Sequence, residues 1–254
     1  SIARFSSITT SSPFRFNLTN ALLDDDATTI KVSPYTTTST TLFVGTSTGK
    51  ILKVENANTG SPTWSNIGST IGVAGSVSNI AFGATENEIM VTFHNYGVNS
   101  VWFTTNGGTS WSNKEGNLPD IPVKAIIMNP LNNDEVIIGT GLGVWKTGNF
   151  KDASPSWSQS YNGMSDVKVT SFSLRSADNV VMATTYGRGM FTGQFLTGTS
   201  SVEDVLKDNK VFTMYPTVSN GSFTVFAKNS LGKAGLRMFD INGREVHRQQ
   251  LDFT

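Results

Sequence analysis

The residues that could support acid–base or nucleophilic chemistry are few in this sequence and stand far apart. There are two histidines, His94 and His247, and no cysteine. Two histidines are too few for a three-histidine metal site, and without cysteine the chain can form no disulfide, thiolate nucleophile or cysteine-ligated zinc. Neither histidine is accompanied by a serine in a nucleophile-elbow sequence. We therefore expect no metal ion and no cofactor.

Carboxylates and arginines offer another route to catalysis, the cleavage of a glycosidic bond. That reaction needs two carboxylates that face each other across a cleft. Asp120 and Asp166 are candidates, since both lie in segments that connect predicted β-units. Sialidase chemistry also needs an arginine cluster, and residues 1–195 hold four arginines at positions that do not correspond: Arg4, Arg15, Arg175 and Arg188. The sequence alone pairs none of these groups.

Three further segments resemble ligand sites but have simpler interpretations. The glycine-rich run Gly139-Thr-Gly-Leu-Gly143 is followed by a β-run, whereas a phosphate loop needs a helix after it. Asp24-Asp-Asp26 could offer oxygen ligands to Ca²⁺, but a solvated acidic turn is the favoured interpretation. Asp240-Ile-Asn-Gly243 lacks the downstream glutamate of a calcium loop, so we interpret it as a hairpin turn.

Charge and hydropathy limit the partners. Nineteen basic residues balance nineteen acidic ones among 254, so no global field steers the chain toward nucleic acid. No run approaches the roughly 18 apolar residues of a membrane helix. No basic segment followed by an apolar one opens the chain. If the protein is exported, we expect its signal peptide to lie upstream or to have been removed.

A repeat of tryptophans organises the first three quarters of the chain. Trp64, Trp111 and Trp157 stand 47 and 46 residues apart, and each closes a segment that begins with an apolar β-run. A period of this size is typical of the four-stranded blades of a β-propeller. The sequence therefore predicts an all-β fold, a partial propeller of about three to four four-stranded blades in residues 1–195.

Alignment of the repeats places the strands. First strands are predicted at 30–34, 79–83, 126–130 and 172–176, and second strands at 41–45, 88–92, 135–139 and 180–184. Third strands follow at 49–54, 100–104, 143–147 and 189–193, and a fourth strand with the tryptophan closes only the first three units. The segment Phe14–Leu18 could be an outer strand of an earlier unit. Because propellers usually close with four to eight blades, we expect further blades upstream.

The most specific local motif is Thr104-Thr-Asn-Gly-Gly-Thr-Ser-Trp111. It resembles the Asp-box (BNR) motif, Ser-x-Asp-x-Gly-x-Thr-Trp, of sialidase-like, sortilin-like and xyloglucanase-like propellers. The matching positions are Thr104, Asn106, Gly108, Ser110 and Trp111, and every replacement keeps a side chain that can close an Asx-type turn. The resemblance implies a structural element on the blade periphery, so we expect the repeat tryptophans to pack in the core.

The other two tryptophan units retain less of this motif. They keep Pro62-Thr-Trp64 and Pro155-Ser-Trp157, but their turns are longer. We therefore expect the motif to be degraded there.

The last part of the chain has a different character. Residues 196–210 are polar and lack the blade pattern, which is typical of a linker. Residues 211–254 contain two motifs, Met214-Tyr-Pro-Thr-Val-Ser-Asn-Gly-Ser-Phe-Thr-Val225 and Leu236-Arg-Met-Phe-Asp-Ile-Asn-Gly-Arg-Glu-Val246. This segment resembles the type A C-terminal sorting domain of Bacteroidota type IX secretion cargo. The matching residues are Tyr215, Pro216, Gly221, Phe223, Asp240, Gly243 and Arg244.

The resemblance implies a small β-sandwich domain that is incomplete here and that the secretion machinery recognises. Thr217 and Val218 stand where the family has Asn-Pro, which is a departure from its first motif. Asn242-Gly243 between alternating runs is a hairpin signal in its own right. The alternative is a generic small β-sandwich appended to a propeller.

Three functional hypotheses fit these observations. The first is a secreted or cell-surface propeller of binding or structural type, exported by a type IX system and recognising a polysaccharide or a surface protein. The second is a secreted glycoside hydrolase of sialidase or xyloglucanase character, with its catalytic residues largely upstream. The third, an adhesin that binds polysaccharide without turnover, overlaps the first.

Overall fold

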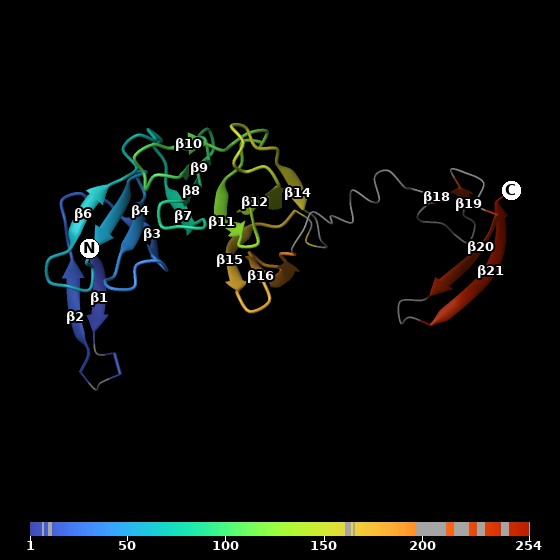
Figure 1. Cartoon of the computed structure of the whole chain (residues 1–254), viewed down its shortest axis with the longest axis horizontal. Coiled ribbons are helices and arrows are strands. Elements are labelled where there is room, and N and C mark those ends of the chain that lie inside the picture. Colours follow the sequence, from blue (N-terminus) through green and yellow to red (C-terminus); the bar gives the residue numbers. More distant parts are fainter. Residues whose placement is uncertain are drawn as a thin grey trace. The chain divides into compact units, whose positions relative to one another are not determined.

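The computed structural model describes residues 1–6, 8–9, 12–160, 164, 166–196, 212–215, 224–227, 232–239 and 244–253. The chain divides into two compact units, Ser1–Thr197 and Gly198–Thr254. Each is described by itself (Figure 1). Among the described residues no helix is long and apolar enough to cross a membrane.

The first unit consists of a hairpin and four antiparallel sheets, which we name blades A to D. The hairpin pairs β1 (Ile2–Ser6) with β2 (Phe14–Leu18). Blade A is formed by β3 (Ala27–Val32), β4 (Leu42–Thr46), β5 (Ile51–Glu55) and β6 (Thr63–Asn66). Blade B is formed by β7 (Val77–Phe82), β8 (Ile89–Phe93), β9 (Val101–Thr104) and β10 (Ser112–Asn113). Blade C is formed by β11 (Val123–Asn129), β12 (Asn132–Thr140), β13 (Gly143–Thr147) and β14 (Ser158–Ser160). Blade D has three strands, β15 (Val169–Arg175), β16 (Val180–Thr185) and β17 (Met190–Gln194).

The second unit contains two antiparallel strand pairs in its described part. One pairs β18 (Phe212–Tyr215) with β19 (Thr224–Ala227), and the other pairs β20 (Gly232–Phe239) with β21 (Glu245–Phe253). From Gly232 to Met238 the residues of β20 alternate between half-buried and exposed. This alternation is typical of a strand with one covered face.

The blade pattern confirms the predicted all-β fold with three four-stranded units and one partial unit. The second strands of blades A and B are buried on both faces, as their continuous apolar runs predict, and every residue of β8 is buried; β16 of blade D is half-buried at four of its six residues. The first strands begin two or three residues earlier than predicted. The cause is a polar residue near the start of each first strand, which interrupts the apolar pattern.

That polar residue marks a β-bulge in every blade. The register of the first strand shifts across Thr28, Ser78, Lys124 and Thr170. Two of these side chains reach the next blade, because the hydroxyl of Thr28 donates to Val77 O and that of Ser78 donates to Val123 O, both at 2.6 Å. The acceptor is the first residue of the neighbouring first strand. The bulges at Thr28 and Ser78 therefore fix the register of blade A against blade B and of blade B against blade C.

The core lies between successive blades. Phe43 and Ile51 of blade A pack with Ile80 and Val91 of blade B in one cluster. A second cluster joins blades B and C, and a third joins blades C and D. Blades B and C are each covered on both faces by neighbouring blades, so their apolar faces are removed from water only when the blades stack.

The N-terminal hairpin covers the outer face of blade A. Ile2 and Leu18 are buried against Val44, Leu52 and Val54. The sequence predicts a strand at Phe14–Leu18 alone, and the structure adds β1 as its partner.

Neighbouring blades approach each other closely at two glycines of the second strands, Gly45 and Gly139. A Cβ atom at Gly45 would overlap Val77 of blade B, and at Gly139 it would lie 2.6 Å from Val169 Cγ1 of blade D. We expect Gly45→Ala to lower the free energy of unfolding by about 1–3 kcal/mol, because the tightly packed neighbours must shift. Urea unfolding measures this loss. Gly148→Ala is the matched control, since a Cβ there meets nothing within 4 Å; an equal loss in both variants would contradict the packing argument.

Candidate functional site

The predicted motif of blade B forms a closed, hydrogen-bonded turn between β9 and β10. The Thr104 hydroxyl donates to Asn106 Oδ1 at 2.8 Å and accepts the backbone N–H of Gly108 at 3.1 Å. Asn106 Oδ1 also accepts the Ser110 N–H at 3.0 Å, and Asn106 Nδ2 donates to Ser110 Oγ at 2.9 Å. The structure therefore brings the five predicted residues into one turn, in which side chains replace backbone partners.

The turn is also anchored to the preceding blade. The indole N–H of Trp111 donates to Ile67 O at 2.7 Å, and a Cβ at Gly108 would lie 2.6 Å from the Ile67 Cβ. Gly108 has a φ of 93°, a conformation that favours glycine. The motif thus closes its own turn and attaches blade B to the residue that follows β6.

Blade C repeats this arrangement, which sequence reasoning missed. The Thr147 hydroxyl donates to Asn149 Oδ1 at 2.8 Å, Ser156 N–H donates to the same oxygen at 2.9 Å, and Trp157 Nε1 donates to Lys114 O at 2.9 Å. The longer turn conceals the match, because Ser156 stands seven residues after Asn149 instead of four. The Thr-x-Asn spacing shared by residues 104–106 and 147–149 was the available signal.

The repeat tryptophans pack against the apolar clusters of the first unit. Trp157 is 3% exposed and packs edge-on against Phe150, with ring centres 6.2 Å apart. Trp111 and Trp64 are half-buried against the clusters of blades A and B. Trp64 Nε1 is buried without a hydrogen-bond partner among the described residues.

One end of the blades gathers cationic and aromatic side chains. In each blade the residue after the second strand donates its N–H to the residue before the first strand, as in His94 N to Ser76 O at 3.1 Å and Tyr186 N to Lys168 O at 2.9 Å. These residues therefore lie at the same end of blades B and D. Lys124, the bulge residue of blade C, lies at this end too. We name His94, Lys124, Lys168 and Tyr186 the basic end.

Electrostatic interactions connect the residues of the basic end. Burial and the charges of Lys124 and Lys168 lower the pKa of His94, so its ring is neutral at neutral pH. Burial and the charge of Lys168 lower the pKa of Lys124. The Lys168 ammonium lies 5.5 Å from the centre of the Tyr186 ring, within cation–π range, and Tyr186 is 76% exposed. Within the described residues neither lysine forms an ion pair.

The predicted carboxylate candidates are each engaged separately. Asp120 accepts the Gly97 N–H at 2.8 Å, and Asp166 accepts the side-chain amide of Gln159 at 2.6 Å. Three of the four arginines also have separate partners: Arg4 donates to Ala57 O and Thr59 O, Arg175 pairs with Asp178, and Arg188 donates to Met164 O. In the described part of the chain no three His, Asp or Glu side chains are grouped as metal ligands.

A cleft of about 870 Å³ runs along the first strands of the blades. Its lining mixes apolar side chains, such as Val32, Phe82 and Met128, with polar ones, such as Lys31 and Asn79. The cleft holds no carboxylate among the lining residues. Its lining residues therefore include no pair of carboxylates that could act as acid and base.

The sorting-signal residues lie mostly outside the described residues. Tyr215 ends β18, and Arg244 immediately precedes β21 and is exposed. The remaining five predicted positions fall outside the described ranges: Pro216, Gly221, Phe223, Asp240 and Gly243.

No protein-family model and no curated protein matches the chain. Among solved structures, the chain is similar to the β-propeller domain of Cps50 (Swd1) from Myceliophteria thermophila, with a TM-score of 0.52 and 12% identity over 74% of this chain and 62% of that one. An ancestral GH74 enzyme matches with a TM-score of 0.46 and 19% identity, over 89% of this chain and 32% of the enzyme. The GH74 enzyme of Niastella koreensis matches with a TM-score of 0.38 and 19% identity, over 60% of this chain and 26% of the enzyme.

The blade topology and the likeness to the Cps50 domain establish the fold of the first unit as part of a β-propeller. At 12% identity this likeness concerns the fold alone. The chain spans about a third of the length of the ancestral GH74 enzyme.

The turn of blade B gives a direct test of its hydrogen-bond network. We expect Asn106→Ala to lower the free energy of unfolding by about 1–3 kcal/mol, because the partners Thr104 and Ser110 lose their shared acceptor. Asn106→Asp keeps that oxygen and should retain most of the stability. Chemical unfolding of both variants measures the difference. Equal destabilisation by alanine and aspartate would show that the oxygen does not hold the turn.

Proposed function

We propose that the chain is part of a cell-surface propeller that binds an acidic polysaccharide at its basic end. We also propose that a type IX secretion system exports it through residues 211–254. The observation that carries the ligand assignment is the grouping of Lys124, Lys168 and Tyr186 at one end of blades C and D.

The chemistry of the basic end suits a uronic acid or sulfated sugar. Two ammonium groups without ion pairs in the described chain attract carboxylates or sulfates, and an exposed tyrosine ring can stack on a sugar face. The carboxylates of Asp120 and Asp166 accept hydrogen bonds from Gly97 N–H and the Gln159 side chain. Neutral His94 contributes hydrogen bonding rather than charge at neutral pH.

The export proposal is supported by the sequence of the tail. Tyr215-Pro216 and Asp240-Ile-Asn-Gly243-Arg244 resemble parts of the two motifs of the sorting domain. The described pairs β18–β19 and β20–β21 agree with a small β-domain. Surface export also suits a protein without cysteine that recognises glycans.

Binding to a panel of polysaccharides tests the ligand assignment. We expect polygalacturonate to bind in calorimetry and neutral dextran not to bind. Lys124→Gln with Lys168→Gln should weaken binding about tenfold, because two ion pairs are lost. Lys151→Gln, an exposed change on the turn between β13 and β14, is the matched control. Preference for the neutral polymer would refute the proposal, and release of reducing ends would support the hydrolase hypothesis instead.

The titration of His94 provides a pH-dependent test of the same site. Because Lys124 and Lys168 depress the pKa of His94, Lys168→Gln should raise it, and a bound anion should raise it further. By linkage, affinity should increase as the pH falls through the pKa of His94. NMR measures the pKa, with exposed His247 as the internal reference. An unchanged His94 pKa in saturating polygalacturonate would place the ligand elsewhere.

Deletion of residues 211–254 tests export. In a bacterium that has a type IX system, we expect the full protein at the cell surface and the truncated protein in the periplasm. The variant Lys233→Gln, which lies outside both motifs, should be displayed normally. Surface display of the truncated protein would refute the export proposal without affecting the binding proposal.

A further inference from the structure

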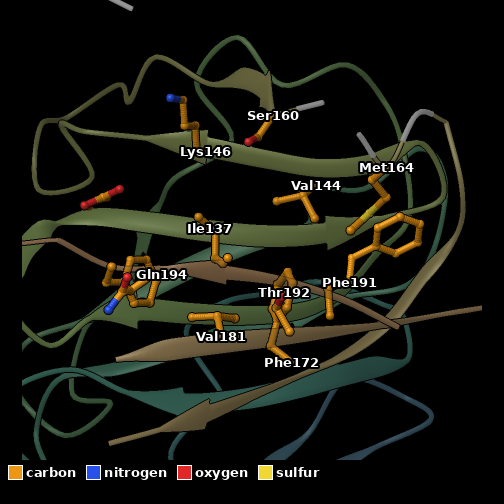
Figure 2. A pocket seen from close by; sticks show the side chains of 14 residues that line it. Ile137, Val144, Lys146, Ser160, Met164, Phe172, Val181, Phe191, Thr192 and Gln194 are labelled. Atoms are coloured by element: carbon orange, nitrogen blue, oxygen red, sulfur yellow. The ribbon is translucent and has the colours of Figure 1, made fainter. Parts of the chain in front are cut away.

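A cavity of about 220 Å³ lies between blades C and D (Figure 2). Blade C contributes Ile137, Val144 and the stem of Lys146, and blade D contributes Phe172, Ala183 and Phe191. Met164 and Phe191 lie together at one side in Figure 2. The cavity belongs to a blade interface, and its lining combines these apolar side chains with polar ones that include Glu135, Ser160 and Gln194.

The equivalent space in the other interfaces is filled by a tryptophan. Trp157, which precedes the fourth strand of blade C, is buried in the cluster shared with blade B and donates to Lys114 O. Trp111 occupies the same place between blades A and B and donates to Ile67 O. Each tryptophan enters with a fourth strand that pairs antiparallel with the third.

Blade D differs in two ways that leave the space open. The described residues of this blade include three strands and no fourth strand. Ala183 also occupies the position that Ile138 has in blade C and Val91 has in blade B. Each of the three pairs with the equivalent residue of its third strand, which is Phe191, Trp145 or Trp102. Phe195 remains buried beside the cavity at the position of Phe150, the ring against which Trp157 packs.

Among the described residues, no strand pairs with the edge of β17 beside the cavity. Thr185 N–H donates to Gly189 O. In an antiparallel pair every second residue bonds to the partner strand, so the backbone groups of Phe191 and Gly193 bond to β16. The backbone groups of Met190, Thr192 and Gln194 then point away from β16. In blades A and B the carbonyl at the position of Met190 accepts the fourth strand, as in Ile67 N to Ile51 O at 2.9 Å and Lys114 N to Val101 O at 2.8 Å.

We propose that β17 and the adjoining cavity form a docking site for an extended segment of another polypeptide that carries a tryptophan. The segment pairs antiparallel with β17, and its indole fills the cavity against Phe191 and Phe195. The three tryptophan-bearing fourth strands of this chain define the chemistry of this occupant. The site is separate from the basic end and does not depend on the polysaccharide proposal.

A synthetic peptide with the sequence of residues 151–160, Lys-Asp-Ala-Ser-Pro-Ser-Trp-Ser-Gln-Ser, is the probe. Fluorescence anisotropy of the labelled peptide, titrated with the full chain, should show saturable one-to-one binding. Replacing the tryptophan of the peptide by alanine should weaken binding at least tenfold. Absence of saturable binding, or equal binding of both peptides, would overturn the proposal.

Variants of the protein locate the site. Ala183→Ile restores the residue of blade C, so it should reduce peptide affinity at least tenfold and raise Tm by about 2–4 °C as the cavity fills. Thr184→Ile is the matched control, because the neighbouring side chain of β16 faces the opposite side of the sheet; it should leave affinity unchanged. Equal affinity of the Ala183→Ile variant and the original chain would overturn the location.

A second variant separates docking from folding. Thr192→Pro removes an N–H from the edge of β17 beside the cavity, so it should abolish binding while circular dichroism and the Tm stay close to those of the original chain. Retained binding would overturn strand addition. A dimer that the peptide dissociates, seen by sedimentation, would assign the edge to a second copy and overturn the proposal of a foreign segment.

Discussion

The close approach of each first strand to the blade before it is the constraint on which the rest of the propeller depends. Burial of apolar faces is not directional, so it would allow neighbouring sheets to slide. The buried bonds from Thr28 to Val77 O and from Ser78 to Val123 O remove that freedom, because a misaligned blade would leave a buried carbonyl unpaired. Gly45 makes room for this approach. The strand ends of blades A, B and C are therefore held at one level.

A second set of contacts fixes the outer strands. The turns at Thr104–Trp111 and Thr147–Trp157 each donate an indole N–H to the blade before them. The polar side chains of these turns form hydrogen bonds within the turn or to the preceding blade, so few of their donors and acceptors remain for a ligand. The inner and outer contacts together join blade A to blade B and blade B to blade C.

The sequence predicted the repeated features and missed those that depend on neighbours. The tryptophan period and the apolar runs predicted three full units and one partial unit, because burial on both faces of a central strand needs continuous apolar residues. The starts of the first strands were wrong, since the polar bulge residues Ser78 and Lys124 look like loop residues when the blade beside them is unknown. The turn of blade C was missed because its length hides a shared Thr-x-Asn pair. The proximity of Lys124 and Lys168 follows only from the stacking of blades C and D.

The net charge of the chain does not reveal the local grouping of positive charge at the basic end. The chain is neutral overall, yet Lys124 is held half-buried near Lys168, an arrangement that lowers the pKa of Lys124 and raises the free energy of its charged form. The fold does not require a lysine at this bulge, because Thr28 and Ser78 occupy it in blades A and B and add an inter-blade hydrogen bond that Lys124 does not make. At this position Lys124 lacks the inter-blade hydrogen bond that Thr28 and Ser78 make, and its charge is repelled by that of Lys168. An anion bound between the two lysines, as we propose, would offset both terms, whereas no contact among the described residues gives Lys124 a stabilising role.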